Sequence, residues 1–295
     1  MQDGNANTYG WAMKVIKARV MGFCFGVRRA VQMAEAALQD APTGAKVYAL
    51  GQLIHNPTVM ESLEAQGMCV ISAQQAADVE AGSVVVVCSH GAEQGTLALL
   101  KGRGVCVQDA TCPKVLSSQR KVREAAAKGQ EVVIAGDKNH GEVLSVASCA
   151  EGVQVVQSAQ EAEAISCSEG ALLLAQTTFG QEEFERIAGV LCAKCPRLEV
   201  FDSICPATRQ RQEALKEISG KADGVLVIGG RGSSNTKRLF EAAEHLFDKA
   251  ALIESSQQIP EEFFALDTVA LTAGASTPDD VINEVELCLL ARGGL

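Results

Sequence analysis

The sequence has few aromatic residues, no long apolar run and no excess of positive charge, and each absence excludes a class of protein. Aromatic residues make up 4% of the 295 residues, too few for a platform that stacks nucleic-acid bases. The net charge of −10 would repel phosphate backbones and anionic lipid surfaces. No apolar run approaches the roughly 18 residues that a membrane span needs. The sequence therefore predicts no nucleic-acid partner and no membrane partner.

The first twelve residues are polar and lack the basic-then-apolar order of a secretory signal peptide. We therefore expect residues 1–12 to form a loose or disordered extension and the protein to be cytoplasmic. Its eleven cysteines should then be reduced, because structural disulfides are rare in the cytosol. The useful question is which of these cysteines can bind a metal.

Short β-branched runs that end at glycine or polar residues alternate with helical stretches along the chain. This pattern is typical of parallel sheets that helices cover on both faces. In such sheets ligands gather at the carboxyl ends of the strands. We therefore predict an α/β fold with mostly parallel sheets. The runs span residues 46–56, 83–91, 131–141, 171–180, 224–235 and 267–277.

Three cysteines each follow a further strand-like run, and two of these runs are near copies. VCVQDATCP and EVFDSICP both end in Asp-x-x-Cys-Pro, and the run KVIKARVMGFCFG also reaches a cysteine. Cys24, Cys112 and Cys205 are therefore spaced about ninety residues apart, which predicts three similar α/β units in a three-lobed, trefoil-like arrangement. The predicted units are 26–111, 112–204 and 205–295, preceded by a first strand and cysteine loop at 13–25 that could pair with the third unit.

This arrangement would bring Cys24, Cys112 and Cys205 to one point. A closed structural zinc site needs four ligands, commonly in Cys-x-x-Cys pairs, and cubane iron–sulfur clusters normally have four thiolates. A cluster held by three cysteines leaves one iron open, which favours catalysis over simple electron transfer. We interpret the other eight cysteines as small buried residues. We interpret the pair Cys192 and Cys195 in the same way, without a metal or redox function, because no second Cys-x-x-Cys pair accompanies it and it follows a helical stretch.

Polar residues stand at two strand ends of each predicted unit. Three of the four histidines, His55, His90 and His140, occupy such ends. Together with hydroxyl and amide groups they predict a pocket for a diphosphate. Glu142 could carry protons if burial raises its pKa towards neutrality. The hydroxyl and amide residues at the other strand ends are Gln176, Thr177, Thr178, Ser233, Ser234, Asn235 and Ser276.

Nine motifs along residues 13–290, in the order GFCFGV, IHN, SHG, DATCP, NHGEV, QTT, DSICPATRQ, GSSN and TAGAST, resemble those of the 4-hydroxy-3-methylbut-2-enyl diphosphate reductases, the IspH/LytB family. The resemblance implies a three-lobed fold around one central [4Fe–4S] cluster per chain. Its three cysteine ligands would be Cys24, Cys112 and Cys205, with one open iron.

The resemblance also implies a reaction. The C4 hydroxyl of (E)-4-hydroxy-3-methylbut-2-enyl diphosphate would leave as water, with two electrons and two protons. The products would be isopentenyl diphosphate and dimethylallyl diphosphate, the last step of the methylerythritol phosphate route to isoprenoids. A ferredoxin or flavodoxin system would be the transient electron donor.

The implied catalytic residues are Glu142, which relays protons, Thr177, which contacts the substrate hydroxyl, and His140. The chain departs from the family pattern at Gly141, where proline is usual, and at Ser145, where glycine is usual. Pro206 is a third departure, because an aromatic or other residue is common after the last cysteine. Gly141 should loosen the loop that carries Glu142. The implied substrate-binding residues are His55, His90, His140, Thr177, Thr178, Thr208, Ser233, Ser234, Asn235 and Ser276, with Thr208 near the cluster.

Two other functions would use the same cysteines. A hydro-lyase would use an open iron without redox change, although the ring of diphosphate donors favours the reductase. A sensor or electron carrier would bind a cluster without catalysis, and a Glu142→Gln change would then have little effect.

Overall fold

The computed structural model describes residues 13–167 and 170–292, so the extension predicted at 1–12 lies outside the described residues. The described strands form three four-stranded sheets, and every strand pair is parallel. The predicted α/β fold with three similar lobes is therefore confirmed. The chain divides into two compact units, Cys24–Thr208 and Met1–Phe23 with Arg209–Leu295. The borders predicted between the α/β units stay a prediction.

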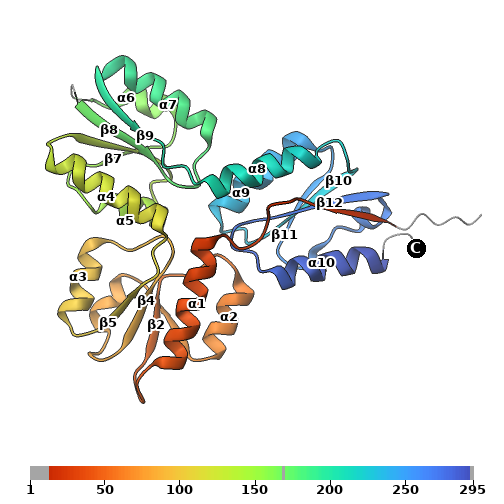
Figure 1. Ribbon diagram of the computed structural model, residues 1–295, viewed down its shortest axis with the longest axis horizontal. Helices are drawn as coiled ribbons and strands as arrows, with labels where there is room; N and C mark the ends of the chain where they lie inside the picture. The colour runs from red at the N-terminus through yellow and green to blue at the C-terminus, as the bar shows by residue number, and fades with distance from the viewer. Residues whose placement is uncertain (1–12, 168–169, 293–295) are drawn as a thin grey trace, which may run out of the picture. The chain divides into compact units, whose positions relative to one another are not determined.

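The unit Cys24–Thr208 contains two of the sheets, each with helices on both faces (Figure 1). The first sheet has the strand order β3-β2-β4-β5 and the second has the order β7-β6-β8-β9. The first sheet and its helices comprise α1 (Phe25–Asp40), β2 (Val47–Leu50), α2 (Pro57–Ala65), β3 (Met68–Ile71), a 3₁₀ turn (Gln74–Asp78), β4 (Val84–Val87), α3 (Gln94–Gly102) and β5 (Cys106–Asp109). The second sheet and its helices comprise α4 (Pro113–Ala127), β6 (Glu131–Ala135), α5 (Gly141–Ala147), β7 (Gln154–Val156), α6 (Ala159–Ala164), β8 (Gly170–Ala175), α7 (Gln181–Lys194) and β9 (Arg197–Phe201).

The other unit contains the third sheet, with the strand order β1-β12-β10-β11. Its first strand comes from the start of the described chain and pairs in parallel with β12. The helix α8 (Pro206–Ile218) begins in the first unit and continues into this one. Its other elements are β1 (Lys14–Lys17), β10 (Gly224–Ile228), α9 (Ser234–Leu246), β11 (Ala250–Ile253), 3₁₀ turns (Ser256–Gln258 and Glu261–Ala265), β12 (Thr268–Ala273) and α10 (Asp279–Arg292).

The same strand order recurs in all three sheets. The two central strands carry the polar strand ends, and the strand that leads to a cysteine lies at the edge beside the second central strand. The central strands are almost wholly apolar because both of their faces are covered. In β8, for example, Leu173 belongs to one core cluster while Leu172 and Leu174 belong to the cluster on the opposite face. The repeat thus places equivalent loops at equivalent sheet ends.

Every strand-like run predicted from the sequence contains a strand, but β3, β7 and β11 were not predicted. These three strands have three or four residues each and lie at the opposite edge of each sheet. Their burial is only partial, so their sequences lack the continuous apolar run of a central strand. Within residues 13–167 and 170–292, no helix combines the length and the apolar composition of a membrane span.

Candidate active site

The three predicted cluster cysteines all belong to the unit Cys24–Thr208, and each directly precedes a helix. Burial raises the pKa of the Cys112 thiol, and the neighbouring charges of Cys24 and Cys205 raise it further. These two contributions require Cys24 and Cys205 each to lie near Cys112. The amides of Lys114 and Val115 in the first turn of α4 act in the opposite direction. The structure therefore brings the three thiols together at helix starts, where anions are stabilised.

The first turn of α1 fits directly against Cys112. A side chain at Gly26 would place its Cβ 2.8 Å from Cys112 Sγ, so only glycine allows this approach. Arg29, one turn later, donates to the carbonyls of Asp109 and Thr111 at 3.2 and 3.3 Å. The start of α1 and the loop before α4 are thus held together around two of the thiols. Sequence reasoning missed Arg29, because its contacts span about eighty residues.

The two Asp-x-x-Cys motifs form the same local turn. The Asp109 carboxylate accepts the amide of Thr111 at 2.9 Å, and the Asp202 carboxylate accepts the amide of Ile204 at 3.3 Å. Such turns, in which an aspartate accepts the amide two residues later, fix a tight loop. The amide of each following cysteine then donates to a neighbouring strand end, Cys112 to Ser89 at 3.0 Å and Cys205 to Thr177 at 2.8 Å. Each cysteine is therefore tied to the loop that carries a predicted substrate residue.

The three histidines form one cluster in this unit. The ring centroids are 5.3 Å apart for His55 and His90, 4.8 Å for His90 and His140, and 6.5 Å for His55 and His140. Burial lowers the pKa of His90 to about 3, with further contributions from His140 and His55. His90 is therefore neutral near pH 7, and the three histidines that the sequence places at strand ends lie beside one another.

The histidine cluster has the geometry of a metal site but not its chemistry. One ring nitrogen from each histidine lies within 4.8 Å of the others. However, Nδ1 of His140 accepts the amide of Glu142 at 3.2 Å. His140 is therefore neutral and carries its proton on Nε2, so that nitrogen can donate a hydrogen bond but offers no lone pair to a metal. Donors of this kind suit an anion.

Glu142 lies in the first turn of α5 and is only 2% exposed. Its carboxyl oxygens accept the amide of Thr177 at 2.5 Å and the hydroxyl of Thr177 at 2.7 Å. Burial raises the pKa of Glu142 to about 7, although the two bonds from Thr177 lower it. Because the carbonyl of Thr177 accepts the amide of Cys205, this titratable group lies next to a cysteine loop. A carboxyl group that titrates near neutrality can both give and take a proton.

Ser145 is fully buried and joins the loop after β4 to α4 and α5. Its hydroxyl accepts Nε2 of Gln119 at 2.8 Å and donates to the carbonyl of Ala92 at 3.3 Å. Gly91 has a φ of +79°, and a Cβ there would lie 2.4 Å from the Ser145 hydroxyl. Ser145, which departs from the family pattern, therefore occupies the space beside Gly91, where no side chain fits. The sequence did not indicate a role for Gln119, because no local pattern in a helix predicts a side-chain bond to a residue such as Ser145 on another helix.

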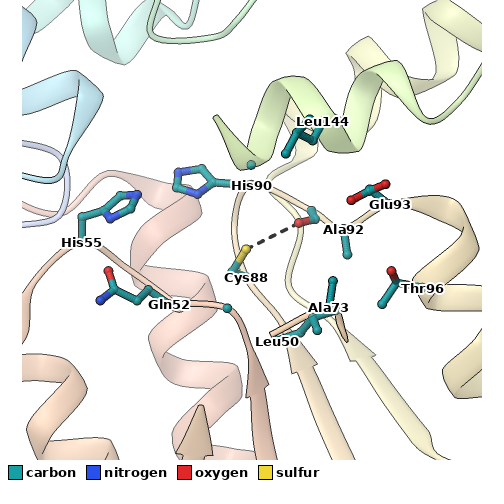
Figure 2. A pocket seen from close by; sticks show the side chains of 13 residues that line it. Leu50, Gln52, His55, Ala73, Cys88, His90, Ala92, Glu93, Thr96 and Leu144 are labelled. Atoms are coloured by element: carbon teal, nitrogen blue, oxygen red, sulfur yellow. Dashed lines mark hydrogen bonds between the residues drawn. The ribbon is translucent and has the colours of Figure 1, made fainter. Parts of the chain in front are cut away.

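A cavity of about 330 Å³ opens beside the histidines. Figure 2 shows His55 and His90 on one side of the cavity, Cys88 below His90, Leu144 of α5 at the top, and Glu93 and Thr96 on the side away from His55. The thiol of Cys88 donates to the carbonyl of Gly91 at 3.5 Å. Burial raises the pKa of Cys88, so this cysteine is a neutral packing residue rather than a nucleophile.

The remaining predicted site residues have the following positions. Thr208 is buried, and its amide donates to the carbonyl of Cys205 at 2.9 Å. Thr178 accepts Nε2 of Gln176 at 2.8 Å. In the unit that holds the third sheet, Ser233 caps α9 by accepting the amide of Thr236 at 3.3 Å. Ser233 and Ser276 are buried in the loops that follow the adjacent strands β10 and β12, and Ser234 and the buried Asn235 form the start of α9.

The Cys192–Cys195 pair lies at the end of α7. Cys195 is buried but Cys192 is exposed, so the two thiols have different environments. The expectation of buried cysteines is therefore wrong for Cys192, and also for Cys69 and Cys106, which are exposed. Cys195 contacts Cys167, and burial together with a hydrogen bond to Cys195 raises the pKa of Cys167 to about 11. This raised pKa makes Cys167 a poor metal ligand and a poor nucleophile.

Comparison with known proteins gives one consistent family. The family model described as LytB protein matches residues 15–289. A 4-hydroxy-3-methylbut-2-enyl diphosphate reductase of Treponema denticola is 42% identical over 94% of this chain and 99% of its own length. A protein of the same name from Caldanaerobacter subterraneus is 39% identical over 92% of this chain and 95% of its own length.

Solved structures agree with the sequence comparison. The structure of an (E)-4-hydroxy-3-methyl-but-2-enyl diphosphate reductase, described as the terminal enzyme of the non-mevalonate pathway, superposes with a TM-score of 0.71 at 33% identity. It matches 95% of this chain and 99% of that one. The corresponding reductase of Plasmodium falciparum gives a TM-score of 0.87 at 27% identity, over 93% of this chain and 87% of that one.

Proposed function

This chain belongs to the LytB protein family, and we propose that it reduces (E)-4-hydroxy-3-methylbut-2-enyl diphosphate to isopentenyl and dimethylallyl diphosphates. The reaction removes the C4 hydroxyl as water and consumes two electrons and two protons. The observation that carries the proposal is the bonding of Glu142 to Thr177, whose carbonyl in turn accepts the amide of the cysteine loop at Cys205. Glu142 as the proton donor and the cluster site at Cys205 as the electron source would thus act on the same substrate molecule.

The three thiols fit an iron–sulfur cluster. Cys24, Cys112 and Cys205 are free cysteines, Cys24 and Cys205 both act on the pKa of Cys112, and Gly26 leaves room beside Cys112 Sγ. We assign them as the three ligands of one [4Fe–4S] cluster per chain. When bound, the cluster supplies electrons one at a time and one iron without a protein ligand. The amides at the starts of α1 and α4 favour the negative charge that the thiolates bring.

The histidines bind the diphosphate of the substrate. Nε2 of His140 carries a proton, and His90 is neutral near pH 7 because it is buried. Both can donate hydrogen bonds to phosphate oxygens, and such bonds are strong because the acceptor is charged. The negative charge of the ligand would raise the histidine pKa values and strengthen binding further. The roles of His55, Thr178, Thr208, Ser233, Ser234, Asn235 and Ser276 in substrate binding stay predictions.

Glu142 supplies protons through or beside Thr177. With a pKa of about 7 it is partly protonated at neutral pH. In that form it can donate a proton towards the leaving hydroxyl, and Thr177 would contact that hydroxyl; the bond from the Thr177 hydroxyl to Glu142 supports this role. Gly141 precedes Glu142, but the carboxyl group is held by two bonds despite the glycine. The electrons come from a transient partner such as a ferredoxin or flavodoxin, in the cytoplasm.

The test is anaerobic purification followed by iron and sulfide analysis and turnover with dithionite and methyl viologen. About four irons per chain with reductive turnover of the hydroxymethylbutenyl diphosphate is the expected result. Iron without turnover would favour a hydro-lyase or a sensor. Zinc in place of iron would contradict the cluster assignment.

A further inference from the structure

Ser203 lies inside the second Asp-x-x-Cys motif, just before Ile204 and Cys205, and it is buried. Its hydroxyl accepts the amide of Ala175 at 2.7 Å and donates to the carbonyl of the same residue at 2.6 Å. Ala175 is the last residue of β8. One hydroxyl thus satisfies both backbone groups of the strand end, and Ser203 joins the cysteine loop to β8.

These two bonds continue the sheet at the point where its ladder stops. In a parallel sheet, the amide and the carbonyl of one residue bond to the same neighbouring strand. The last pair between β8 and β9 is Leu174 with Phe201, where β9 ends. Ala175 is only 2% exposed, so its amide and carbonyl need a partner from the protein. The side chain of Ser203 takes the place of the missing strand.

The same strand end leads to the proposed proton donor. Thr177 follows Ala175 after one intervening residue, and its carbonyl accepts the amide of Cys205 at 2.8 Å. The amide and the hydroxyl of Thr177 both donate to Glu142. The hydroxyl of Ser203 and the amide of Cys205 therefore both fasten the loop of a proposed cluster ligand to the strand end that contacts the proposed acid.

The other Asp-x-x-Cys motif is held in a different way. Ala110 stands there at the position of Ser203 and has no hydroxyl. Its backbone amide donates to the carbonyl of Val87, the last residue of β4, at 3.3 Å. Arg29 of α1 adds its two bonds to carbonyls of this loop. The Asp-x-x-Cys turn therefore does not itself require a serine, and the serine occurs in the loop that contacts the proposed acid.

We propose that Ser203 is a positioning residue, which keeps Cys205 and the Glu142–Thr177 pair in one fixed arrangement. The inference rests on the proposed function, in which an electron source at Cys205 and a proton donor at Glu142 act on one substrate molecule. Such a step is sensitive to small displacements of the groups that take part. Without the hydroxyl, the cysteine loop would lose its attachment to the end of β8, and the two groups could move apart.

The test uses Ser203→Ala, with Ser203→Thr as the conservative variant that keeps a hydroxyl. The matched control is Ser158→Ala in the same lobe, where the Ser158 hydroxyl caps α6 by accepting the amide of Glu161 at 3.2 Å. Both alanine variants remove a hydroxyl that accepts a backbone amide, so both should lose stability. Each cluster-loaded protein is compared in its release of iron to a chelator and in its viologen-driven steady-state kinetics.

Ser203→Ala should lower kcat about tenfold and leave KM within about twofold, because the histidines that bind the diphosphate are not attached through Ser203. It should also release iron about tenfold faster. Ser203→Thr should bring both values back to within about threefold of the unsubstituted protein, and Ser158→Ala should change neither. An unchanged kcat in Ser203→Ala would overturn the positioning role. Equal losses in Ser158→Ala would overturn it as well, because stability alone would then explain them.

Hydrogen exchange of the anaerobically purified protein, followed by mass spectrometry, gives a readout without turnover. In Ser203→Ala, residues 174–177 and 202–206 should exchange about tenfold faster, while residues 109–113 around Cys112 should not change. In the unsubstituted protein the first two segments should exchange at similar rates, because the loop and the strand end would open together. Exchange of 202–206 about a hundredfold faster than that of 174–177 would overturn the proposal even if Ser203→Ala did not fold.

The failure of this inference can be distinguished from the failure of the proposed function. If the exchange results are as expected but the unsubstituted protein shows no viologen-driven turnover, the proposed function fails while Ser203 still joins the cysteine loop to β8. If the unsubstituted protein and Ser203→Ala turn over equally well, the positioning role fails while the proposed function stands.

Discussion

The two lobes of the unit Cys24–Thr208 share one scaffold but provide different chemistry. In the first lobe, the ends of β2 and β4 lead to His55 and His90, and β5 leads to Cys112. At the equivalent positions of the second lobe stand His140, Thr177 and Cys205. The first lobe therefore presents two imidazoles, of which that of His90 is neutral near pH 7, whereas the second adds a hydroxyl group and, through Glu142, an acid that titrates near pH 7.

Burial explains both sets of properties. Burial disfavours the charged form of any side chain, so it lowers the pKa of His90 and raises that of Glu142. The same environment thus keeps a base neutral for anion binding and keeps an acid protonated for proton transfer. The repeat fixes where polar groups meet, and the residue type decides what each group does.

Replacing a cluster cysteine should have the largest effect, and the loss of iron should be the same for the cysteine of either lobe. Cys112→Ser and Cys205→Ser should each abolish cluster binding or make the cluster labile, because both cysteines supply a thiolate from the same turn. Iron and sulfide content after anaerobic purification measures this. Cys24→Ser should behave in the same way. Cys192→Ser and Cys195→Ser are the controls, and loss of iron in either would contradict the ligand assignment.

The next largest effect is a loss of kcat, and we expect it from the acid of the second lobe, Glu142. Glu142→Gln should lower kcat by roughly 10²–10⁴-fold while the cluster stays intact, because the amide cannot donate a proton in the same way. Viologen-driven turnover and the iron content would be measured on the same sample. Full turnover in this variant would show that Glu142 has no role in proton transfer and would favour another acid.

In the first lobe the expected loss is in binding. His90→Gln should raise KM roughly 10–100-fold, since it removes one donor to a charged ligand, with a smaller effect on kcat. Steady-state kinetics separate the two constants, and His245→Gln, on the helix α9, is the control. A loss confined to kcat would mean that His90 acts in the chemical step instead.

The pH dependence should distinguish the lobes as well. Because the native pKa of Glu142 is raised to about 7 from its ordinary 4.5, the native state favours the protonated form. Its contribution to the free energy of unfolding is fully present below about pH 4.5 and is lost as the pH rises through about 7. Viologen-driven kcat should likewise fall as the pH rises above about 7. The residual activity of Glu142→Gln should not show this fall, and if it does another group controls it.

Much of this site could be predicted from the sequence because the repeat is periodic. Strand runs of continuous apolar residues are enough to place His55, His90 and the cysteines at sheet ends. Contacts between the lobes could not be predicted in this way. The bond from Gln119 to Ser145 joins residues that no local pattern relates, and it exists only because α4 and α5 pack against the loop after β4. Short edge strands such as β7 were not predicted for a related reason. They form because a neighbouring strand pairs with them, and no pattern in their own sequence indicates that pairing.

The smallest expected effect tests how the two lobes are held together. Ser145→Ala removes the hydroxyl that accepts from Gln119 and donates to the carbonyl of Ala92, which leaves a buried amide without that partner. The free energy of unfolding should fall by about 1–3 kcal/mol. Chemical denaturation of the apo protein measures this. Ser118→Ala is the matched control, because its hydroxyl bonds within α4 to Lys114 at 3.4 Å.

The same bond should also matter for His90, which precedes Gly91 in the loop that Ser145 supports. Ser145→Ala should raise KM a few-fold through a more mobile His90, with kcat little changed, because Glu142 keeps its bonds to Thr177. Gly91→Ala should be far worse, since its Cβ would lie 2.4 Å from the Ser145 hydroxyl at a φ of +79°. Combining Gly91→Ala with Ser145→Gly would remove the 2.4 Å contact, but it would leave the backbone strain and the contacts with Gln119 Nε2 at 3.0 Å and Thr111 Cγ2 at 3.2 Å. Partial recovery of stability in the double variant would show that the Ser145 hydroxyl contributes to the loss, and no recovery would assign the loss to the strain and the other two contacts.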